Sequence, residues 1–229
     1  MKLINTITWR YMPIGEAALL VECTPASPLA NRYALSLAQT LDALALPGLY
    51  SAVPALSSLL IRFDPLLFSH TQIEARVRGV LERLAPSPAK PERIVTIPVI
   101  YGGADGPDLV EVAERLGLAP RALVAEHCAY MYRVMMIGFA PGFPYIGPLP
   151  EQLVLPRRAT PRSAVPAGSV AIAAGLTGIY PARLPGGWHL IGRTSLRLFD
   201  PAASPPSTLA PGDGVRFTSL PEGLIHVHS

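Results

Sequence analysis

Residues 137–194 read IGFAPGFPYIGPLPEQLVLPRRATPRSAVPAGSVAIAAGLTGIYPARLPGGWHLIGRT, and this stretch decides the fold. Nine of its 58 residues are glycine and nine are proline, a composition seen in disordered chains. Disordered chains, however, lack the large apolar side chains that recur here at Phe139, Phe143, Tyr145, Ile146, Tyr180 and Trp188. Because glycine permits backbone shapes closed to other residues and proline fixes φ, the stretch predicts a folded series of tight turns joined by short strands.

The same stretch carries most of the positive charge of the chain. Its only carboxylate is Glu151, whereas it holds five arginines, at positions 157, 158, 162, 183 and 193, so its local charge is +4. The whole chain has a net charge of +3, so all other residues together sum to −1. Positive charge gathered where the backbone is most constrained predicts a surface that handles anions.

The composition is that of a folded protein with one large domain or two ordinary ones. Half of the 229 residues are hydrophobic, which allows a substantial core. The net positive charge alone is compatible with nucleic-acid binding. Only two lysines occur, however, at Lys2 and Lys90, and there is no run of basic residues. We therefore expect no nucleic-acid partner.

Cysteine usage and hydropathy indicate a cytoplasmic protein. Cys23 and Cys128 lie far apart without C-x-x-C spacing, which predicts two buried, reduced thiols. The N-terminal residues lack the apolar core and cleavage pattern of a signal peptide. The most hydrophobic window, residues 134–150, is interrupted by prolines and glycines, so we expect no membrane-spanning helix and no membrane partner.

Strand and helix patterns alternate over the first 90 residues. Strands are predicted at residues 16–24 and 56–63. A helix is predicted after Ser27-Pro28, a serine N-cap with proline at the first helical position, with Gly48 as its C-terminal cap. Thr71 and Glu74 predict a capping box for a second helix. The pattern predicts a small α+β domain over residues 1–90, with helices packed on one face of a sheet.

The remaining residues predict a mainly-β domain. A strand over residues 94–102 precedes two short helices that begin at Pro107 and Pro120, and helical periodicity ends at Arg133. Short strands are then predicted at residues 133–139, 169–174, 188–192, 195–199, 215–219 and 223–229. Their spacing and the turn residues between them predict a closed or nearly closed barrel over residues 91–229.

Common catalytic motifs are missing from the sequence. Residues 101–106 (YGGADG) are glycine-rich but lack the lysine of a nucleotide-binding loop, and Ser169 lacks the final glycine of a nucleophile elbow. His226 and His228 would lie on one side of a strand, but no third ligand accompanies them, so no metal site is expected. No residue is assigned a catalytic role.

The other two notable histidines lie in different contexts. His127 lies on the apolar side of its helix, and we interpret it as a core histidine with satisfied hydrogen bonds. His189 follows Gly186, Gly187 and Trp188, where small residues let a ligand approach and a large ring can form a wall. For His189 two interpretations stay open, a site residue or ordinary strand packing.

Arg157, Arg158 and Arg162 form the strongest chemical feature, because neighbouring prolines hold their backbone. The planar guanidinium fits carboxylate or phosphate, and nearby hydroxyls would add donors, at Thr160, Thr177 and Thr194. Two interpretations stay open: these arginines bind an anionic ligand, or they pair with carboxylates of the other domain or of a partner chain. Since no acid–base pair accompanies the arginines, the stretch looks like half of an active site.

Several segments are also typical of one family: GFAPGFPY (138–145), PRRATPR (156–162), VPAGSV (165–170), TGIYP (177–181), PGGWHLIGRT (185–194), PIGEAALLV (13–21) and SLLIRFDP (58–65). Together they resemble the family of the 5-oxoprolinase B subunit, also called KipI-like or allophanate hydrolase subunit 1, which is similar to a part of the carboxyltransferase domain of urea carboxylase. The resemblance extends over nearly the whole chain. It implies an α+β N-terminal domain followed by a cyclophilin-like β-barrel.

The resemblance implies a hydrolase subunit that acts only with partners. The family is associated with ATP-dependent opening of 5-oxoproline to L-glutamate, together with a KipA-like protein (the C subunit) and often an A subunit. It therefore implies a small anionic substrate and, at the level of the complex, ATP with Mg²⁺. Two alternatives accompany it: a KipI-like inhibitor of a sensor histidine kinase, and a carboxyltransferase subunit related to allophanate hydrolase or urea carboxylase.

These observations combine into one hypothesis for the site. Substrate or another anion is expected at Arg157, Arg158, Thr160, Arg162, His189 and Arg193. The pocket is expected to be shaped by Phe139, Gly142, Phe143, Tyr145, Thr177, Tyr180, Gly186, Gly187 and Trp188. Leu176 and Pro148 depart from the usual family pattern of glutamine and glycine, so we expect substrate contacts to differ there.

Overall fold

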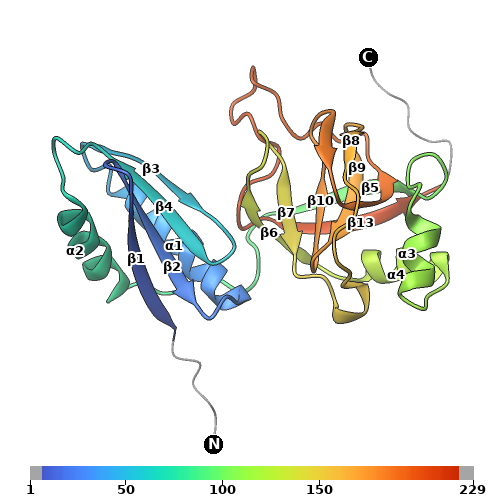
Figure 1. Ribbon diagram of the computed structural model, residues 1–229, viewed down its shortest axis with the longest axis horizontal. Helices are drawn as coiled ribbons and strands as arrows, with labels where there is room; N and C mark the ends of the chain where they lie inside the picture. The colour runs from blue at the N-terminus through green and yellow to red at the C-terminus, as the bar shows by residue number, and fades with distance from the viewer. Residues whose placement is uncertain (1–6, 222–229) are drawn as a thin grey trace, which may run out of the picture. The chain divides into compact units, whose positions relative to one another are not determined.

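A computed structural model describes residues 7–221 of the chain (Figure 1). The chain divides into two units, Met1–Lys90 and Pro91–Ser229, of which residues 7–90 and 91–221 are described. Each unit has its own hydrophobic core. The candidate site residues all belong to the second unit.

The first unit is a four-stranded antiparallel sheet with two helices. The strands are β1 (Thr8–Ile14), β2 (Ala18–Thr24), β3 (Leu49–Pro54) and β4 (Ser58–Phe63), in the spatial order β1-β2-β4-β3. The helices are α1 (Pro28–Ala43) and α2 (His70–Leu81). Alternate strand residues such as Leu19, Val21 and Ile61 are fully buried, and they pack with Leu37 of α1 and Ile73 of α2. The alternation places one apolar face of the sheet against the helices.

The helix ends of this unit partly differ from the predictions. Ser27 caps α1 as predicted, because its Oγ accepts the Ala30 N–H at 3.1 Å. Gly48 is not the C-terminal cap, since α1 ends at Ala43 and Gly48 adopts a positive φ of 87° in the turn before β3. The capping box of α2 is formed by Ser69 and Gln72 rather than by Thr71 and Glu74, because the helix begins earlier than the spacing suggested.

The second unit is built on a closed barrel with the strand order β10-β7-β6-β13-β5-β12-β9 (Figure 1). Its strands are β5 (Ile94–Tyr101), β6 (Tyr132–Ile137), β7 (Pro144–Gly147), β9 (Ser169–Ala173), β10 (Leu176–Ile179), β12 (His189–Arg193) and β13 (Gly214–Leu220). Strands β5 and β13 pair in parallel, and the other neighbours are antiparallel. The predicted barrel is confirmed.

Short elements cover the barrel. Strands β8 (Arg162–Val165) and β11 (Leu184–Gly186) form a separate two-stranded ribbon. Two helices, α3 (Leu109–Arg115) and α4 (Pro120–Ala129), lie between β5 and β6 in sequence, and a 3₁₀ turn spans Glu151–Leu153. Figure 1 shows α3 and α4 side by side at one end of the barrel strands.

Strand β9 explains why the central stretch behaves as a core although it is rich in glycine and proline. All five of its residues are buried. Val170 and Ile172 belong to the barrel core, whereas Ala171 and Ala173 pack in a second cluster with Phe143, Tyr180 and Trp188. Because successive strand residues point to opposite faces, β9 serves two cores at once, and alanine leaves room for the rings on the outer one.

Some predicted strands are wrong. Residues 195–199 form no strand apart from an isolated bridge between Phe199 and Ser207, and Leu196 N–H bonds to the Thr194 hydroxyl instead of a ladder. The helix predicted from Pro107 begins at Leu109, because Asp108 N–H donates to Leu190 O of β12. Residues 223–229, with His226 and His228, lie outside the described residues.

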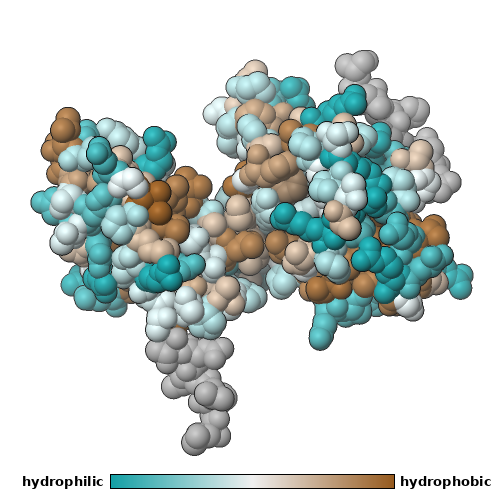
Figure 2. All heavy atoms as spheres, viewed as in Figure 1, coloured by the Kyte–Doolittle hydropathy of each residue, from teal (hydrophilic) through white to brown (hydrophobic). Residues whose placement is uncertain are grey.

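The visible face carries several small groups of exposed apolar side chains among polar ones (Figure 2). Leu66 and Tyr50 of the first unit and Phe139 of the second are the most exposed of the large hydrophobic residues. Apolar atoms make up much of any protein surface, so small exposed groups of this kind do not by themselves indicate a function.

Candidate functional site

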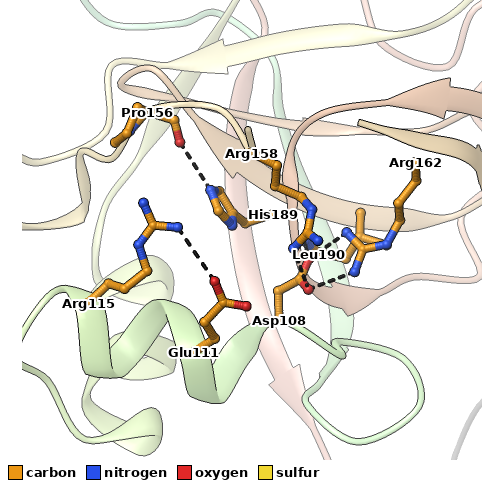
Figure 3. Close-up of polar contacts among 8 residues, drawn as sticks. All are labelled: Asp108, Glu111, Arg115, Pro156, Arg158, Arg162, His189 and Leu190. Carbon is orange, nitrogen blue, oxygen red and sulfur yellow. Dashed lines mark hydrogen bonds and ion pairs between the residues drawn. The ribbon is translucent and has the colours of Figure 1, made fainter. Parts of the chain in front are cut away.

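Asp108 is the centre of the arginine group (Figure 3). Its carboxylate accepts two hydrogen bonds from Arg162, with Nη1–Oδ2 at 2.8 Å and Nη2–Oδ1 at 2.7 Å, and one from Arg158 Nη1 at 3.1 Å. The backbone N–H of Leu190 donates to Oδ2 at 2.7 Å. Only 5% of the Asp108 side chain is exposed, so one buried carboxylate joins the start of α3 to strands β8 and β12.

Asp108 is ionised despite its burial. Burial alone would raise the pKa of this carboxyl, because it removes water from the charged form. The hydrogen bonds from Arg162 and from the Leu190 N–H, with the charges of Arg162 and Arg158, outweigh burial and hold the pKa below its usual value. The same bonds raise the pKa of Arg162. The arrangement is therefore a charged bridge at neutral pH.

This bridge changes the interpretation of the arginines. Arg158 and Arg162 do pair with a carboxylate, but that carboxylate belongs to their own unit rather than to the other domain or to a partner chain. Arg193 forms an ion pair with Asp105, with 3.2 Å between Nε and Oδ1, but without the hydrogen bonds that Asp108 makes. Arg157 forms no ion pair or hydrogen bond within residues 7–221. Two aspartates of the 101–108 turn thus offset much of the charge that the sequence places in 137–194.

His189 lies beside this bridge and is fully buried. Its Nε2 lies 3.0 Å from the backbone oxygen of Pro156. Burial lowers the pKa of His189, with further contributions from Arg115 and Arg158, although the Pro156 bond and Asp108 oppose them. The ring is therefore neutral at neutral pH. Its Nδ1 is buried and has no hydrogen-bond partner within the part of the chain that the structure describes.

A cavity of about 240 Å³ opens beside His189. Its walls come from α3, from the segment before β8 and from β12: Glu111, Arg115, Arg158, Ala159, Thr160 and His189. Three residues of the predicted anion site, Arg158, Thr160 and His189, thus meet at one cavity. Arg162, which is tied to Asp108, and Arg193, which pairs with Asp105, do not line it.

The predicted pocket-shaping rings form a separate cluster. Phe143 makes edge-to-face contacts with Tyr180 at 5.2 Å and with Trp188 at 5.8 Å between ring centroids, and Tyr145 lies 5.8 Å from Trp188. Gly186 is required here, because a Cβ at this position would clash with the Tyr180 hydroxyl. None of these residues lines the 240 Å³ cavity, so their role in the structure is to hold the β8–β11 ribbon against the barrel.

The remaining predicted pocket residues have various structural positions. Phe139 is 59% exposed and has a φ of 70°, at the centre of a γ-turn in which Ala140 N–H donates to Gly138 O. Gly142 also has a positive φ, and a Cβ there would press on Phe199. Gly187 lies near Pro161, at ordinary contact distance. Leu176, the departure from the family pattern, packs against the ring cluster.

Thr177 and Thr194 do not join the arginines. Thr177 is buried in β10, where its hydroxyl donates to Ala171 O at 3.1 Å and lies 3.1 Å from His127 Nε2. Thr194 is also buried, and its hydroxyl accepts the Leu196 N–H. The prediction that these hydroxyls surround an anion with the arginines is therefore wrong, because the barrel uses them internally.

The core interpretation of His127 is confirmed. The residue is fully buried, its Nδ1 lies 2.7 Å from the Tyr101 hydroxyl, and burial lowers its pKa to about 3. Cys23 is buried, Cys128 is half-buried, and both thiols are free. Burial raises the pKa of Cys23 to about 11, so this thiol is unreactive.

Sequence reasoning missed Asp105, Asp108, Glu111 and Arg115. Asp108 lies 50 and 54 residues from its two arginine partners, so no local pattern connects them. The sequence feature that could have pointed to these residues is the pair of aspartates in the glycine-rich turn of residues 101–108, next to a predicted helix start.

Residues 7–221 contain neither a candidate metal cluster nor a helix that could span a membrane. No group of three or more His, Cys, Asp or Glu side chains there is arranged to hold a metal ion. No helix in that part of the chain is long and apolar enough to cross a membrane.

Comparison with known proteins places the chain in a family. The family model for the carboxyltransferase domain, subdomain C and D, matches residues 9–209. The chain is 46% identical over 213 residues to the 5-oxoprolinase B subunit of Escherichia coli O157:H7, a match that covers 92% of this chain and 96% of the relative. This chain belongs to the 5-oxoprolinase B subunit family. The resemblance inferred from the sequence motifs is confirmed.

Other comparisons extend this result. The protein of the same name from Bacillus subtilis (strain 168) is 37% identical, over 97% of this chain and 98% of its own length. The crystal structure of TTHA0988 is 41% identical, with a TM-score of 0.76, and the match covers 94% of this chain but only 40% of that one. The Kluyveromyces lactis urea carboxylase, at 18% identity and a TM-score of 0.76, shares the fold over 96% of this chain and 22% of its own.

Proposed function

We propose that this chain is the B subunit of an ATP-dependent 5-oxoprolinase complex that opens 5-oxoproline to L-glutamate. The observation that carries the proposal is the full-length match to proteins of that name: the relatives from Escherichia coli and Bacillus subtilis align over 96% and 98% of their own length. The match spans the barrel unit with its cavity as well as the first unit. In this proposal the chain is a hydrolase subunit that needs its partners for activity.

The chemistry explains why ATP is needed. Resonance makes the ring amide of 5-oxoproline resistant to water, and transfer of the γ-phosphoryl group of ATP to the amide oxygen, with release of ADP, makes the ring carbon electrophilic. Addition of water to that carbon, followed by cleavage of the ring C–N bond with protonation of the nitrogen, gives an acyl phosphate, which a second water hydrolyses to L-glutamate and phosphate. The described residues do not fit a magnesium–nucleotide site, because the buried carboxylate of Asp108 is already engaged by two arginines and the glycine-rich turn is used by the barrel. Gly102 N–H, for example, donates to Ile191 O. We assign ATP and Mg²⁺ to another subunit.

This chain contributes cations and a shaped cavity. Arg115 and Arg158 at the cavity, with Arg157 on the neighbouring segment, provide positive charge for the carboxylate of a small anionic substrate. The His189 ring forms part of the cavity wall. Asp108 fixes Arg158 at one nitrogen and leaves its other nitrogens for a ligand.

A partner subunit completes the site in this proposal. In TTHA0988 the part similar to this chain is 40% of the polypeptide, so the same fold there continues into further sequence. We assign the corresponding role here to a separate KipA-like protein, the C subunit, acting with the A subunit. We further propose that the closed barrel of the second unit is cyclophilin-like. We also propose that the complex is cytoplasmic, which the two free thiols support.

Reconstitution tests the proposal. The chain is co-purified with its native partners, and ATP hydrolysis and glutamate formation are measured with and without 5-oxoproline. We expect ATP hydrolysis that depends on 5-oxoproline and is lost when this chain is omitted. A correctly assembled complex without 5-oxoproline-dependent ATP hydrolysis would overturn the proposal.

The family model favours one alternative, a carboxyltransferase subunit, because it is described as a carboxyltransferase domain. The same preparation separates the two activities. Turnover of allophanate, or a biotin-bearing partner in the purified complex, would support carboxyl transfer, whereas 5-oxoproline-dependent ATP hydrolysis would exclude it as the main activity.

A further inference from the structure

The cavity beside His189 is bordered by charges of both signs. Helix α3 supplies Glu111 and Arg115 to its wall, and the segment before β8 supplies Arg158. Glu111 and Arg115 are four residues apart, so they lie on one face of α3. Figure 3 shows both side chains extending from α3 toward His189. Besides burial, which is the largest cause, the charges of Arg115 and Arg158 both lower the pKa of His189, so the two cations lie near the same ring.

These three charged groups are accessible to a ligand. Glu111 Oε1 and Arg115 Nη1 are 3.6 Å apart, and the two side chains are 56% and 42% exposed. An exposed pair of this kind is worth little, so a ligand can compete for either partner. Arg158 is 25% exposed and shares the single charge of Asp108 with Arg162. Three guanidinium groups and two carboxylates therefore leave a net charge of +1 beside the cavity.

The proposed reaction changes the charges of its ligand. 5-Oxoproline has one charged group, its carboxylate, because its ring nitrogen is an uncharged amide. Ring opening converts that nitrogen into the α-ammonium of L-glutamate and creates a second carboxylate on the side chain. The carboxylate of Glu111 therefore has no opposite charge to bind on the substrate, whereas the product supplies one.

We propose that this cavity binds the product L-glutamate in preference to the substrate. Glu111 accepts hydrogen bonds from the α-ammonium, Arg115 binds the α-carboxylate, and Arg158 binds the side-chain carboxylate. The α-ammonium and the α-carboxylate are carried by one carbon of the ligand, which matches the adjacent Glu111 and Arg115. The net negative charge of L-glutamate complements the net positive charge of the site. The identity of the ligand rests on the proposed function.

The rest of the wall suits a small polar ligand. Of the six lining residues only Ala159 is apolar, and Thr160 adds a hydroxyl. The volume of about 240 Å³ lies below the range of about 300–1,000 Å³ typical of drug-sized ligands. The cavity therefore offers little surface to the apolar side chain of another amino acid.

Preference for the product has a regulatory consequence. L-Glutamate in the cavity occupies Arg115 and Arg158, the cations that the carboxylate of the next 5-oxoproline molecule needs. The complex should therefore slow as L-glutamate accumulates, and the inhibition should be competitive with 5-oxoproline.

A binding cycle tests the role of Glu111. The assembled complex, without ATP, is titrated by calorimetry with L-glutamate and with glutarate, which has both carboxylates but no ammonium. For the wild type we expect glutarate to bind about tenfold more weakly, the effect of losing one hydrogen bond between charged groups. Glu111→Gln should weaken L-glutamate binding by a similar factor. In that variant the absence of the ammonium should have little further effect, because both changes remove the same contact.

The substrate and a matched variant serve as controls. The wild type should bind L-glutamate more tightly than 5-oxoproline. Glu111→Gln should bind 5-oxoproline as tightly as the wild type or more tightly, because Arg115 loses a competing carboxylate. Glu114→Gln, on the same helix but outside the cavity, should bind all three ligands like the wild type. Thermal unfolding verifies that each variant is folded.

Three results would contradict the inference. The first is wild-type protein that binds 5-oxoproline more tightly than L-glutamate. The second is an ammonium that contributes the same factor in Glu111→Gln as in the wild type, since Glu111 would then not contact it. The third is equal weakening of L-glutamate and 5-oxoproline in Glu111→Gln, which would give Glu111 a general structural role.

The two proposals can fail separately. An active 5-oxoproline-dependent ATPase whose affinity for L-glutamate is independent of Glu111 would overturn this inference and leave the proposed function standing. A complex that binds L-glutamate through Glu111 but shows no 5-oxoproline-dependent ATP hydrolysis would do the reverse.

Discussion

His127 and His189 are both fully buried histidines of the barrel unit, and they differ in one hydrogen bond. Thr177 donates its own proton to Ala171 O, so its oxygen accepts from His127 Nε2, and His127 Nδ1 accepts from the Tyr101 hydroxyl. His189 also carries its proton on Nε2, but its Nδ1 has no partner within residues 7–221. The two side chains are thus equally unexposed, and they differ in whether Nδ1 has a hydrogen-bond partner.

The largest expected effect is on stability at His127. His127→Ala opens a cavity and leaves the Tyr101 hydroxyl without its acceptor, so we expect a loss of about 4 kcal/mol in the free energy of unfolding. The measurement is urea unfolding of the barrel unit followed by Trp188 fluorescence in a Trp9→Phe background. His189→Ala serves as the matched variant and should lose less than half as much. Equal losses in the free energy of unfolding for the two variants would show that the hydrogen bonds of His127 do not distinguish it from His189.

Lowering the pH should also distinguish His127 from His189, through the pH dependence of the free energy of unfolding. Burial lowers the pKa of His127 to about 3, whereas an unfolded histidine titrates near about 6.5. Between these values the unfolded chain binds a proton that the folded chain does not, so stability rises with pH and is lost on acidification, by about 1.4 kcal/mol per pH unit. His127→Leu should lack this component, about 3 kcal/mol between pH 6.5 and 4.

Urea unfolding across that pH range measures the effect. The control is His189→Leu, whose histidine has its pKa lowered less strongly and should change the pH slope less. A wild-type slope that persists unchanged in His127→Leu would show that the proton is taken up elsewhere.

Asp108→Asn tests the bridge that positions the candidate site. The substitution leaves the largely buried guanidinium groups of Arg158 and Arg162 without a charged partner, and their partial contact with water moderates the loss to about 2 kcal/mol. Because the pKa of Asp108 is lowered, its contribution is present above the unfolded pKa and is lost as pH falls through the folded one. The loss in stability should therefore shrink at low pH.

Asp105→Asn is the matched substitution, and it shows how much stability is lost when a more exposed ion pair is broken. Asp105 and Arg193 are each about one third exposed, so Asp105→Asn should cost under about 1 kcal/mol in the same unfolding experiment. A larger loss for Asp105→Asn than for Asp108→Asn would mean that the site is not held by the Asp108 bridge.

The smallest expected effect on stability comes from a substitution that removes one hydrogen bond of His127, so that His127 resembles His189. Tyr101→Phe removes the donor to His127 Nδ1 and so gives His127 the same unpaired nitrogen as His189. We expect a loss of about 1.5 kcal/mol, measured by the same urea unfolding. Thr177→Val, which removes the partner of the other nitrogen, should cost a similar amount. Unchanged stability in Tyr101→Phe would show that an unpaired Nδ1 is tolerated at His127 as well as at His189.

Long periodic elements could be predicted from the sequence, and short irregular ones could not. The helix after Ser27 and the strand that became β5 have enough residues to show their period. Strands β7, β8, β10 and β11 have three or four residues each, too few to show a readable alternation. Their pairing depends on barrel closure rather than on their own composition.

Some residues of the candidate site could be predicted from the sequence, and others could not. Arg158, Thr160 and His189 were selected because arginine and glycine-flanked aromatic patterns have recognisable chemistry, and the structure brings these three to one cavity. The rings around Phe143 had an equally strong pattern, yet they form a packed cluster instead. A pattern shows which side chains have special roles, but it does not separate packing from binding.

The sequence by itself determined the family and the turn-rich framework of residues 137–194, because those depend on local backbone preferences and on motif order. Only the tertiary structure decided that Asp108 would pair with Arg158 and Arg162, and that the buried His189 Nδ1 would have no hydrogen-bond partner within residues 7–221. Both outcomes join residues that are far apart in the chain, such as Asp108 and Leu190 at a separation of 82 residues. Charge pairing and hydrogen-bond satisfaction belong to the assembled environment, which exists only once the barrel has closed.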